Sequence, residues 1–195
     1  MMGLPQSSKR ENILLTAQRL FSRFGLRKTT VEEIIRLTKI AKGTFYKYFP
    51  DKEALFLEVV EKESISLVTD IREAVSRATT SIEKMRAYLL TKVRMINELV
   101  NLYQVTRETV DEYWPRIESI RKRYLAEEQK IVLEILRNGI AKGELEVDAP
   151  ELTANAIVIA VKGLESTWML EESLMELEEG IDILLNVLFK GILRS

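Results

Sequence analysis

The chain has 195 residues, of which 46% are hydrophobic and 30% charged, and a net charge of −1, as is typical of a soluble globular protein of one or two domains. It contains neither cysteine nor histidine, which excludes disulfides and thiol nucleophiles and argues against zinc, iron or copper sites. The most common general base near neutral pH is also missing. We therefore expect no cofactor and no enzymatic activity. The sequence shows no charged-then-apolar leader and no run of about eighteen apolar residues, so we expect a cytoplasmic protein that does not enter the membrane.

The charges are distributed unevenly along the chain. Residues 1–50 carry ten Lys or Arg against three Asp or Glu, a net charge of +7, and the remaining 19 basic and 27 acidic residues give −8. A compact basic segment is what neutralisation of nucleic-acid phosphates requires, and the acidic remainder would limit unspecific binding. The alternative, a basic face that is only solvated, stays open at this point.

Three helices are predicted within the first fifty residues. Apolar residues recur at intervals of three and four from near Ser8, and Gly25 is a suitable end for this first helix. The spacing of Thr30 and Glu33 is that of a capping box, which predicts the start of a short second helix. A third short helix covers 42–48 and ends before Pro50, because a residue that precedes proline is disfavoured in helices.

The rest of the chain also reads as helices, and no segment alternates as a strand would. Prolines 115 and 150 lie where a new helix would begin. The sequence predicts an all-α fold of about nine helices, with a DNA-binding domain at 1–50 and a helical ligand-binding and dimerisation domain at 51–195. The expected later helices are 51–78, 82–101, 105–114, 115–141, 150–170 and 173–192.

The two final helices are apolar on almost every face. Such helices need burial on two sides, which in a small domain indicates a partner subunit in addition to the core. A deeper core within one chain is the alternative. The residues that we assign to a dimer interface are Ile157, Val161, Leu164, Leu184, Val187 and Leu188.

The short second and third helices, joined by about four residues, have the arrangement of a helix-turn-helix motif. In such motifs the later helix enters the major groove and the earlier one crosses the backbone. Cationic and hydroxyl side chains on and beside the third helix suit contacts with phosphates and bases, although Tyr46 and Tyr48 could instead only pack. The predicted DNA-binding residues are Thr30, Lys39, Lys42, Gly43, Thr44, Tyr46, Lys47, Tyr48 and Lys52.

The run from Thr29 to Leu55, TTVEEIIRLTKIAKGTFYKYFPDKEAL, resembles the DNA-binding domain of the tetracycline-repressor (TetR) family. The positions that carry the resemblance are Lys42, Gly43, Thr44, Phe45, Tyr46, Tyr48, Phe49, Lys52 and Leu55. Two positions depart from the family pattern: Lys39 stands where glycine is frequent, and Ala41 where a serine often caps the third helix. Loss of such a cap costs about 1 kcal/mol.

The resemblance implies a homodimer formed by the last two helices, a C-terminal ligand pocket and a repressor released from its operator by ligand. The expected partners are a double-stranded DNA operator of inverted-repeat form in the nucleoid, a second copy of the chain, and a small hydrophobic or amphipathic effector. Amphipathic aromatic and methionine side chains can line an adaptable pocket. The candidates are Tyr88, Met95, Tyr103, Tyr113, Trp114 and Tyr124, with ordinary core or surface positions as the alternative.

Other functions stay open as alternatives. Acidic residues at 98, 108, 111 and 112 would favour a cationic effector if they face inward, whereas a solvated helix face is the simpler interpretation. A DNA-binding regulator without small-molecule sensing is the first alternative function. A helical enzyme built on carboxylates and lysines is the second, against which stands the absence of a phosphate-binding glycine loop or a Glu-x-x-His pattern.

Overall fold

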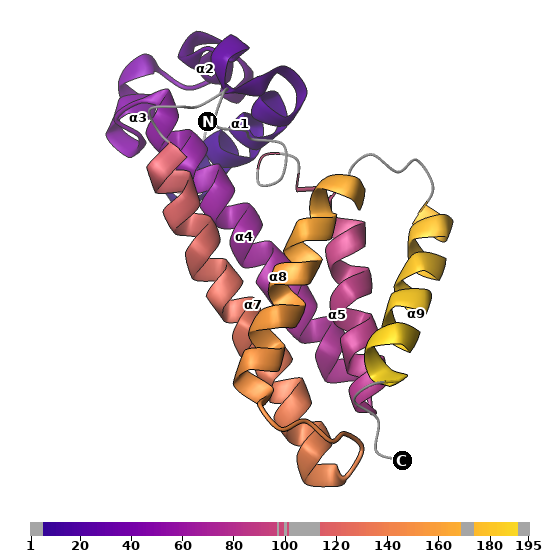
Figure 1. Cartoon of the computed structure of the whole chain (residues 1–195). Helices are drawn as coiled ribbons and strands as arrows, with labels where there is room; N and C mark the ends of the chain where they lie inside the picture. Colours follow the sequence, from indigo (N-terminus) through magenta and orange to yellow (C-terminus); the bar gives the residue numbers. More distant parts are fainter. Residues whose placement is uncertain (1–5, 97, 100, 102–113, 169–173, 191–195) are drawn as a thin grey trace. The chain divides into compact units, whose positions relative to one another are not determined.

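A computed structural model describes residues 6–96, 98–99, 101, 114–168 and 174–190 of the chain. Within these ranges the chain is built of helices, and the all-α class predicted from the sequence is confirmed. The helices are α1 (Gln6–Lys28), α2 (Val31–Thr38), α3 (Lys42–Tyr48), α4 (Lys52–Arg77), α5 (Ser81–Ile96), α7 (Trp114–Lys142), α8 (Pro150–Trp168) and α9 (Leu174–Lys190) (Figure 1). The helix predicted at 105–114 falls, apart from Trp114, outside the described residues.

The helices are distributed over two compact units. The first unit comprises Met1–Ser64 and Val100–Ile120, and the second comprises Ile65–Leu99 and Arg121–Ser195. Helices α4 and α7 contribute residues to both units. The functional boundary that we predict after residue 50 stays a prediction, because a division by packing does not test it.

The core of the first unit is formed where α1 packs on α2 and α2 packs on α3. Ile13 of α1, Ile34 of α2 and Phe45 of α3 are completely buried there. The rings of Phe21 and Phe56 meet edge to face at 5.2 Å, an arrangement that aromatic rings prefer. The short helices α2 and α3 are thus stabilised by burial against α1, since isolated helices of this length are unstable in water.

Helix α1 begins at Gln6, two residues before the predicted start, and its course changes at Gly25. The φ of Gly25 is +77°, and the two helical segments that meet there form a kink. A left-handed φ favours glycine. At Gly25, where the sequence predicts the end of the first helix, the helix changes direction and then continues to Lys28. The buried Thr29 hydroxyl donates to the Gly25 carbonyl at 2.9 Å, which stabilises the turn into α2.

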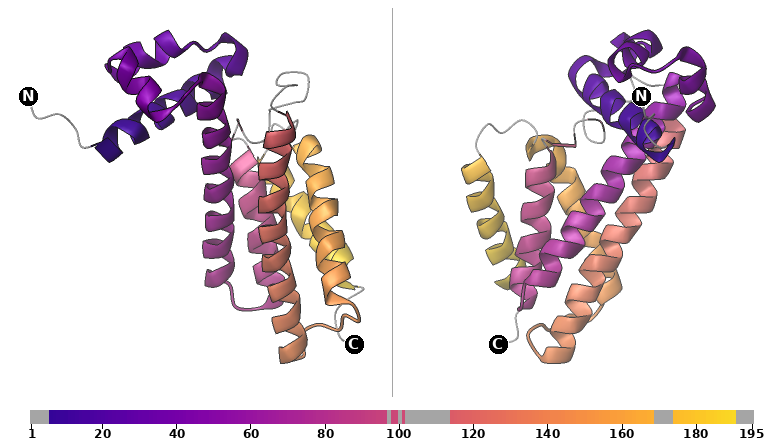
Figure 2. Two further views of the ribbon diagram at one scale, coloured as in Figure 1. Left: turned by 90° about the vertical axis from the view of Figure 1, so that its left-hand side faces the viewer. Right: turned by 180° about the vertical axis from the view of Figure 1, so that it is seen from behind.

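In the second unit α5 lies between α8 and α9 and packs against both (Figures 1 and 2). Two ion pairs join α5 to α9: Arg86 donates to both oxygens of Asp182 at 2.6 and 3.0 Å, and Arg94 pairs with Glu178 at 2.6 Å. Bidentate arginine–carboxylate contacts are stronger than single ones. The hydrogen bonds from Arg86 also lower the pKa of Asp182.

Helices α5 and α7 approach closely at Gly139. A Cβ at this position would lie 2.5 Å from Ser81 Oγ and 2.6 Å from Leu145 Cδ1, so only glycine fits without a shift of its neighbours. The Ser81 amide donates to Glu144 at 2.8 Å next to this contact. Within the described ranges, none of the helices is both long and apolar enough to cross a membrane.

Candidate nucleic-acid interface

The start of α2 is stabilised by the capping box that the sequence predicts. The Glu33 amide donates to Thr30 Oγ1 at 3.2 Å, and the Thr30 amide donates to the Glu33 carboxylate at 2.9 Å. The hydrogen bonds from the backbone and then the hydroxyl of Thr30 lower the pKa of Glu33. The Thr30 hydroxyl also donates to the Glu33 carboxylate at 3.0 Å. This hydrogen bond must break before the hydroxyl can donate to a phosphate.

The turn between α2 and α3 contains both departures from the family pattern. Lys39 adopts left-handed angles of φ +54° and ψ +40°, and its amide donates to the Ile35 carbonyl. This conformation suits glycine and is unfavourable for lysine, so the backbone is strained at the position where the family pattern has glycine. Ala41 occupies the N-cap of α3 and makes no side-chain capping hydrogen bond, as expected from the missing hydroxyl.

Helix α3 has one buried face and one exposed face. Phe45 is fully buried and contacts the rings of Tyr46 and Phe49, whereas Lys42, Gly43, Tyr46 and Lys47 are exposed. No atom outside the helix lies within 4 Å of an ideal Cβ at Gly43. Packing within the described residues therefore does not require glycine at position 43. Close approach of a ligand to the backbone would require it.

Lys42 is paired within the chain. Its ammonium lies 3.3 Å from Glu32 Oε1, and both side chains are largely exposed. The pKa of Glu32 is lowered by a hydrogen bond from its own backbone amide and, to a smaller extent, by Lys42. Exposed ion pairs of this kind contribute little to stability, so Lys42 can exchange Glu32 for a phosphate at small cost.

Lys52 lies where α4 begins. Its ammonium donates to the Thr29 carbonyl at 2.9 Å and so joins this end of α4 to the segment before α2. The Asp51 carboxylate accepts from the Ala54 amide at 2.6 Å and so caps the N-terminus of this helix. The remaining hydrogens of the Lys52 ammonium can still be donated to a phosphate.

A second basic set lies along the end of α1, and the sequence analysis did not select it. Its members are exposed and follow each other at helical spacing: Arg19, Arg23, Arg27 and Lys28. The spacing of four between Arg19 and Arg23 is the signal that could have found the first two, because residues i and i+4 share a helix face, whereas Arg27 and Lys28 follow the kink at Gly25.

The first unit therefore contains both helices of the predicted motif, and most of the candidate DNA-binding side chains are exposed on or beside α3. Thr44 and Tyr48 are half-buried, and Lys52 and Thr30 each have an intramolecular partner. Residues 13–59 match the family model described as bacterial regulatory proteins, tetR family. The resemblance to the TetR family is thereby confirmed for the N-terminal residues 13–59. The chain is a DNA-binding transcriptional regulator with a helix-turn-helix motif.

Whole-chain comparisons agree with the TetR assignment. The chain is 25% identical over 166 residues to the HTH-type transcriptional repressor KstR2 of Mycolicibacterium smegmatis, covering 84% of this chain and 78% of KstR2. A crystal structure of a transcriptional regulator from Cytophaga hutchinsonii superposes with a TM-score of 0.80 at 24% identity, covering 94% of this chain and 98% of that one. The structure of a SmeT–triclosan complex gives a TM-score of 0.72 at 16% identity and covers 96% and 93%. The two structural likenesses show the fold alone.

Four of the six effector-pocket candidates lie within the described residues. Tyr88 is fully buried, while Met95, Trp114 and Tyr124 are half-buried, and Trp114 belongs to the first unit. Tyr103 and Tyr113 lie outside the described residues, as do 108, 111 and 112 of the acidic positions. Glu98 is exposed. The pocket assignment therefore stays a prediction.

Tyr88 belongs to a buried ionic cluster that the sequence did not indicate. The Lys92 ammonium pairs with Glu128 at 2.5 Å and Glu165 at 2.6 Å, and the Tyr88 hydroxyl donates to Glu128 at 3.0 Å. Burial raises the pKa of Glu165 and of Tyr88. The cluster joins α5, α7 and α8, and removal of one partner of such a group leaves an uncompensated charge.

The predicted dimer residues divide between the chain's own core and its surface. Ile157 and Val161 are buried within the second unit. Leu164 and Leu184 are half-buried, and the side chain of Leu188 lies outside the described part. Val187 is exposed. The dimer assignment therefore stays a prediction, because a helix that is apolar on all faces does not reveal from its sequence which face turns inward.

Proposed function

We propose that the chain is a homodimeric repressor whose two helix-turn-helix motifs bind the half-sites of an inverted-repeat operator, and that a small apolar or amphipathic effector releases it. The observation that carries the proposal is the exposed, basic α3 surface, in which Gly43 leaves the backbone open to a ligand. Repression follows because a dimer seated on a promoter blocks polymerase without any further contact surface.

The DNA contacts follow from the chemistry of the exposed side chains. Lys42 and Lys47 on α3 and Lys39 in the preceding turn supply cations for phosphates or guanine edges. The hydroxyl of the exposed Tyr46 can bind a phosphate or a base. The arginines at the end of α1 extend the positive surface and would strengthen binding without regard to sequence.

The dimer is proposed to form through the apolar faces of α8 and α9 that the chain leaves uncovered. Leu152 and Ile159 of α8 are 71% and 55% exposed, and Ile183 and Val187 of α9 are 66% and 68% exposed. Residues seven apart on α8 and four apart on α9 lie on one face of each helix. These faces are distinct from those carrying the buried Ile157 and Ile181, so core packing does not account for them.

The effector class is proposed from composition and from one structural relative. SmeT, which shares the fold, is described in complex with triclosan, and the half-buried Met95, Trp114 and Tyr124 suit an apolar ligand with a polar end. A preference for a cationic ligand over an anionic one is proposed from the acidic positions 98, 108, 111 and 112 of the same stretch of sequence.

DNA binding is tested by selecting bound sequences from a random duplex library, followed by anisotropy titrations over a range of salt concentrations. We expect an enriched palindrome and a steep fall of affinity with salt, since each neutralised phosphate contributes about 0.9 to the logarithmic slope. Lys42→Ala and Tyr46→Phe should weaken binding. A single asymmetric site, or no enrichment by a folded dimer at low salt, would contradict the proposal.

The dimer face is tested by sedimentation with Ile159→Glu and Ile183→Glu. Each change places a charge in a face proposed to be buried, so both variants should be monomeric and bind a palindrome more weakly than the wild type. Ile65→Glu on α4 is the matched control, because Ile65 is also exposed but lies outside α8 and α9. Dimers that survive both α8 and α9 changes would exclude this interface.

Effector binding is tested by thermal melting and by operator release with triclosan, a long-chain fatty acid and a lipophilic cation. A ligand at 100 times its Kd raises the free energy of unfolding by about 2.7 kcal/mol. We expect the cation or triclosan to raise the melting temperature and lower operator affinity. A response to the fatty acid alone would refute the preference for cations, and no response to any would refute effector control by this class.

A further inference from the structure

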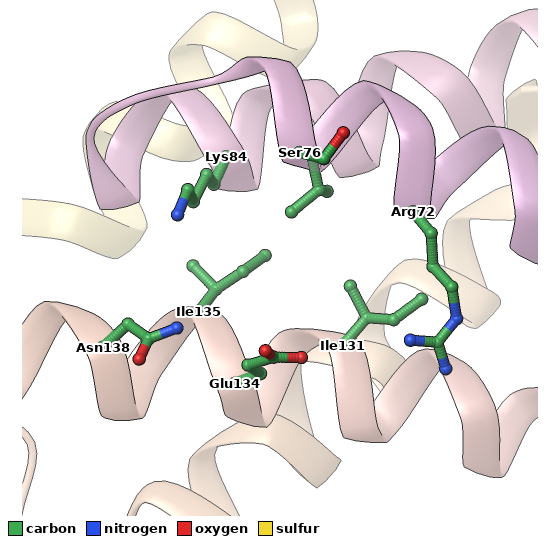
Figure 3. Close-up of a pocket in the computed structure, with 8 residues that line it drawn as sticks. Arg72, Ser76, Lys84, Ile131, Glu134, Ile135 and Asn138 are labelled. Carbon is green, nitrogen blue, oxygen red and sulfur yellow. The ribbon is translucent and has the colours of Figure 1, made fainter.

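A cavity of about 200 Å³ opens in the second unit between α4, the start of α5 and the C-terminal half of α7 (Figure 3). Val75 of α4 and the buried Ile131 and Ile135 of α7 give it apolar walls. A volume of this size suits a small metabolite more readily than a drug-sized effector.

The polar residues around the cavity differ in whether they already have partners. The guanidinium of Arg72 donates to Glu127 at 2.9 Å, and the Ser76 hydroxyl donates to the Glu73 carbonyl at 2.8 Å. In contrast, Lys84 and Glu134 make no ion pair within 4 Å in the described residues, although both line the same cavity. The charge of Lys84 does contribute, as a minor cause, to the lowered pKa of the nearby Glu144.

The third polar group without a partner is the amide of Asn138. It makes no side-chain hydrogen bond within the described chain, and it follows Glu134 by one helical turn on the same face of α7. In Figure 3 the side chains of Lys84 and Asn138 lie at the same end of the cavity on opposite walls, and Glu134 lies next along the wall that carries Asn138. The cavity thus offers one cation, one anion and one amide around an apolar surface.

The combination selects the charge type of a ligand. A simple carboxylate would pair with Lys84 but bring a second negative charge next to Glu134. A simple amine would pair with Glu134 but bring a second positive charge next to Lys84. A zwitterion satisfies both side chains without adding net charge. We propose that this cavity binds a small apolar amino acid: its carboxylate contacts Lys84 and Asn138, its ammonium contacts Glu134, and its side chain packs on Ile131, Ile135 and Val75.

The proposed site is independent of the effector site and of DNA binding. Its residues all belong to the second unit, and none of them is among the candidates for the effector pocket or the DNA interface. The proposed amino-acid site can therefore be tested by a binding measurement on the free protein, without an operator.

The test is isothermal titration with L-leucine and two analogues that each lack one charge. 4-Methylpentanoate lacks the ammonium, and 3-methylbutylamine lacks the carboxylate. We expect leucine to bind at least tenfold more tightly than either analogue. Equal binding of leucine and one analogue would overturn the zwitterion assignment, and no binding of leucine at about 10 mM would overturn the site.

Two variants assign the contacts. Lys84→Met should abolish the advantage of leucine over the amine, and Glu134→Gln should abolish its advantage over the acid. Neither side chain is part of the core, so both proteins are expected to fold, which melting curves check. Lys122→Met and Glu146→Gln change exposed residues of the same charge away from the cavity and should bind leucine as the wild type does. Leucine binding that is unchanged in both cavity variants would place the ligand elsewhere and contradict the proposal.

Discussion

The substitution Gly43→Ala separates folding from DNA binding. Gly43 is the second residue of α3, it is exposed, and an added Cβ would meet no atom within 4 Å. Its φ lies outside the left-handed region, so alanine can adopt the same backbone conformation. The folded protein therefore gains a better helix former at no steric cost.

The magnitudes follow from these observations. Alanine is favoured over glycine in a helix by about 0.8 to 1 kcal/mol, and near the N-terminus of α3 we expect about half of that gain. In the complex the new methyl group occupies space that the DNA backbone needs. If this displaces one base contact, worth about 1 to 3 kcal/mol, the affinity falls roughly tenfold, since each 1.4 kcal/mol is a factor of ten.

Urea denaturation and anisotropy titration with the selected operator measure the two effects. We expect a higher urea midpoint with an unchanged m value and a weaker Kd for DNA. A variant that binds DNA like the wild type would refute the inference that the open space at Gly43 is occupied by DNA. A lower urea midpoint would refute the reading of Gly43 as unconstrained within the chain.

The same change at Gly139 should have the opposite effect on stability. The Cβ would lie 2.5 Å from Ser81 Oγ and 2.6 Å from Leu145, closer than real contacts allow. Overpacking of this kind costs about 1 to 3 kcal/mol, which exceeds or cancels the gain in helix propensity. Gly139→Ala should therefore lower the urea midpoint or leave it unchanged, and a clear increase would show that the α5–α7 contact is looser than the structure describes.

Three further changes test the turn and the buried cluster. Ala41→Ser supplies the missing N-cap of α3 and should raise the free energy of unfolding by about 1 kcal/mol, whereas Ala41→Val should not. Lys39→Gly relieves a left-handed lysine and should raise it by up to about 1 kcal/mol, and a loss of stability would contradict strain at this position. Burial raises the pKa of Glu165, so the protonated side chain is favoured in the folded state. The contribution of protonated Glu165 to the free energy of unfolding is therefore present at low pH and is lost as the pH rises through the folded pKa. The stability of the wild type relative to Glu165→Gln should therefore increase on acidification, and parallel curves in urea denaturation between about pH 4 and 8 would exclude this assignment.

Local signals predicted the DNA-binding end of the chain well. The bounds of α3 agree with the predicted 42–48, the capping box of Thr30 and Glu33 is formed, and the missing cap at Ala41 is observed. Each of these features depends on groups within four residues of each other, so a short stretch of sequence contains the information. The start of α1 at Gln6, before the predicted Ser8, shows that helix ends without a tight turn are less well determined.

The second unit was predicted less completely because its features join residues far apart in the sequence. Ile157 and Ile159 are both apolar residues of α8, yet the first is buried and the second exposed, and only the packing of α5 and its neighbours decides which faces inward. Lys92 and Glu128 are 36 residues apart and look like ordinary surface charges in the sequence. The cavity at Lys84 and Glu134 has the same origin, because helices distant in sequence bring these two residues to one place.

The sequence by itself therefore determined the helical class, the positions of most helices and the bounds of the candidate recognition helix, because hydrogen bonding and hydrophobic periodicity within a helix are local. Only the tertiary structure decided which apolar faces remain for a partner, where charges are buried together and where a cavity opens. Those properties depend on how side chains from separate helices fill the space between them, and pattern alone does not specify that packing.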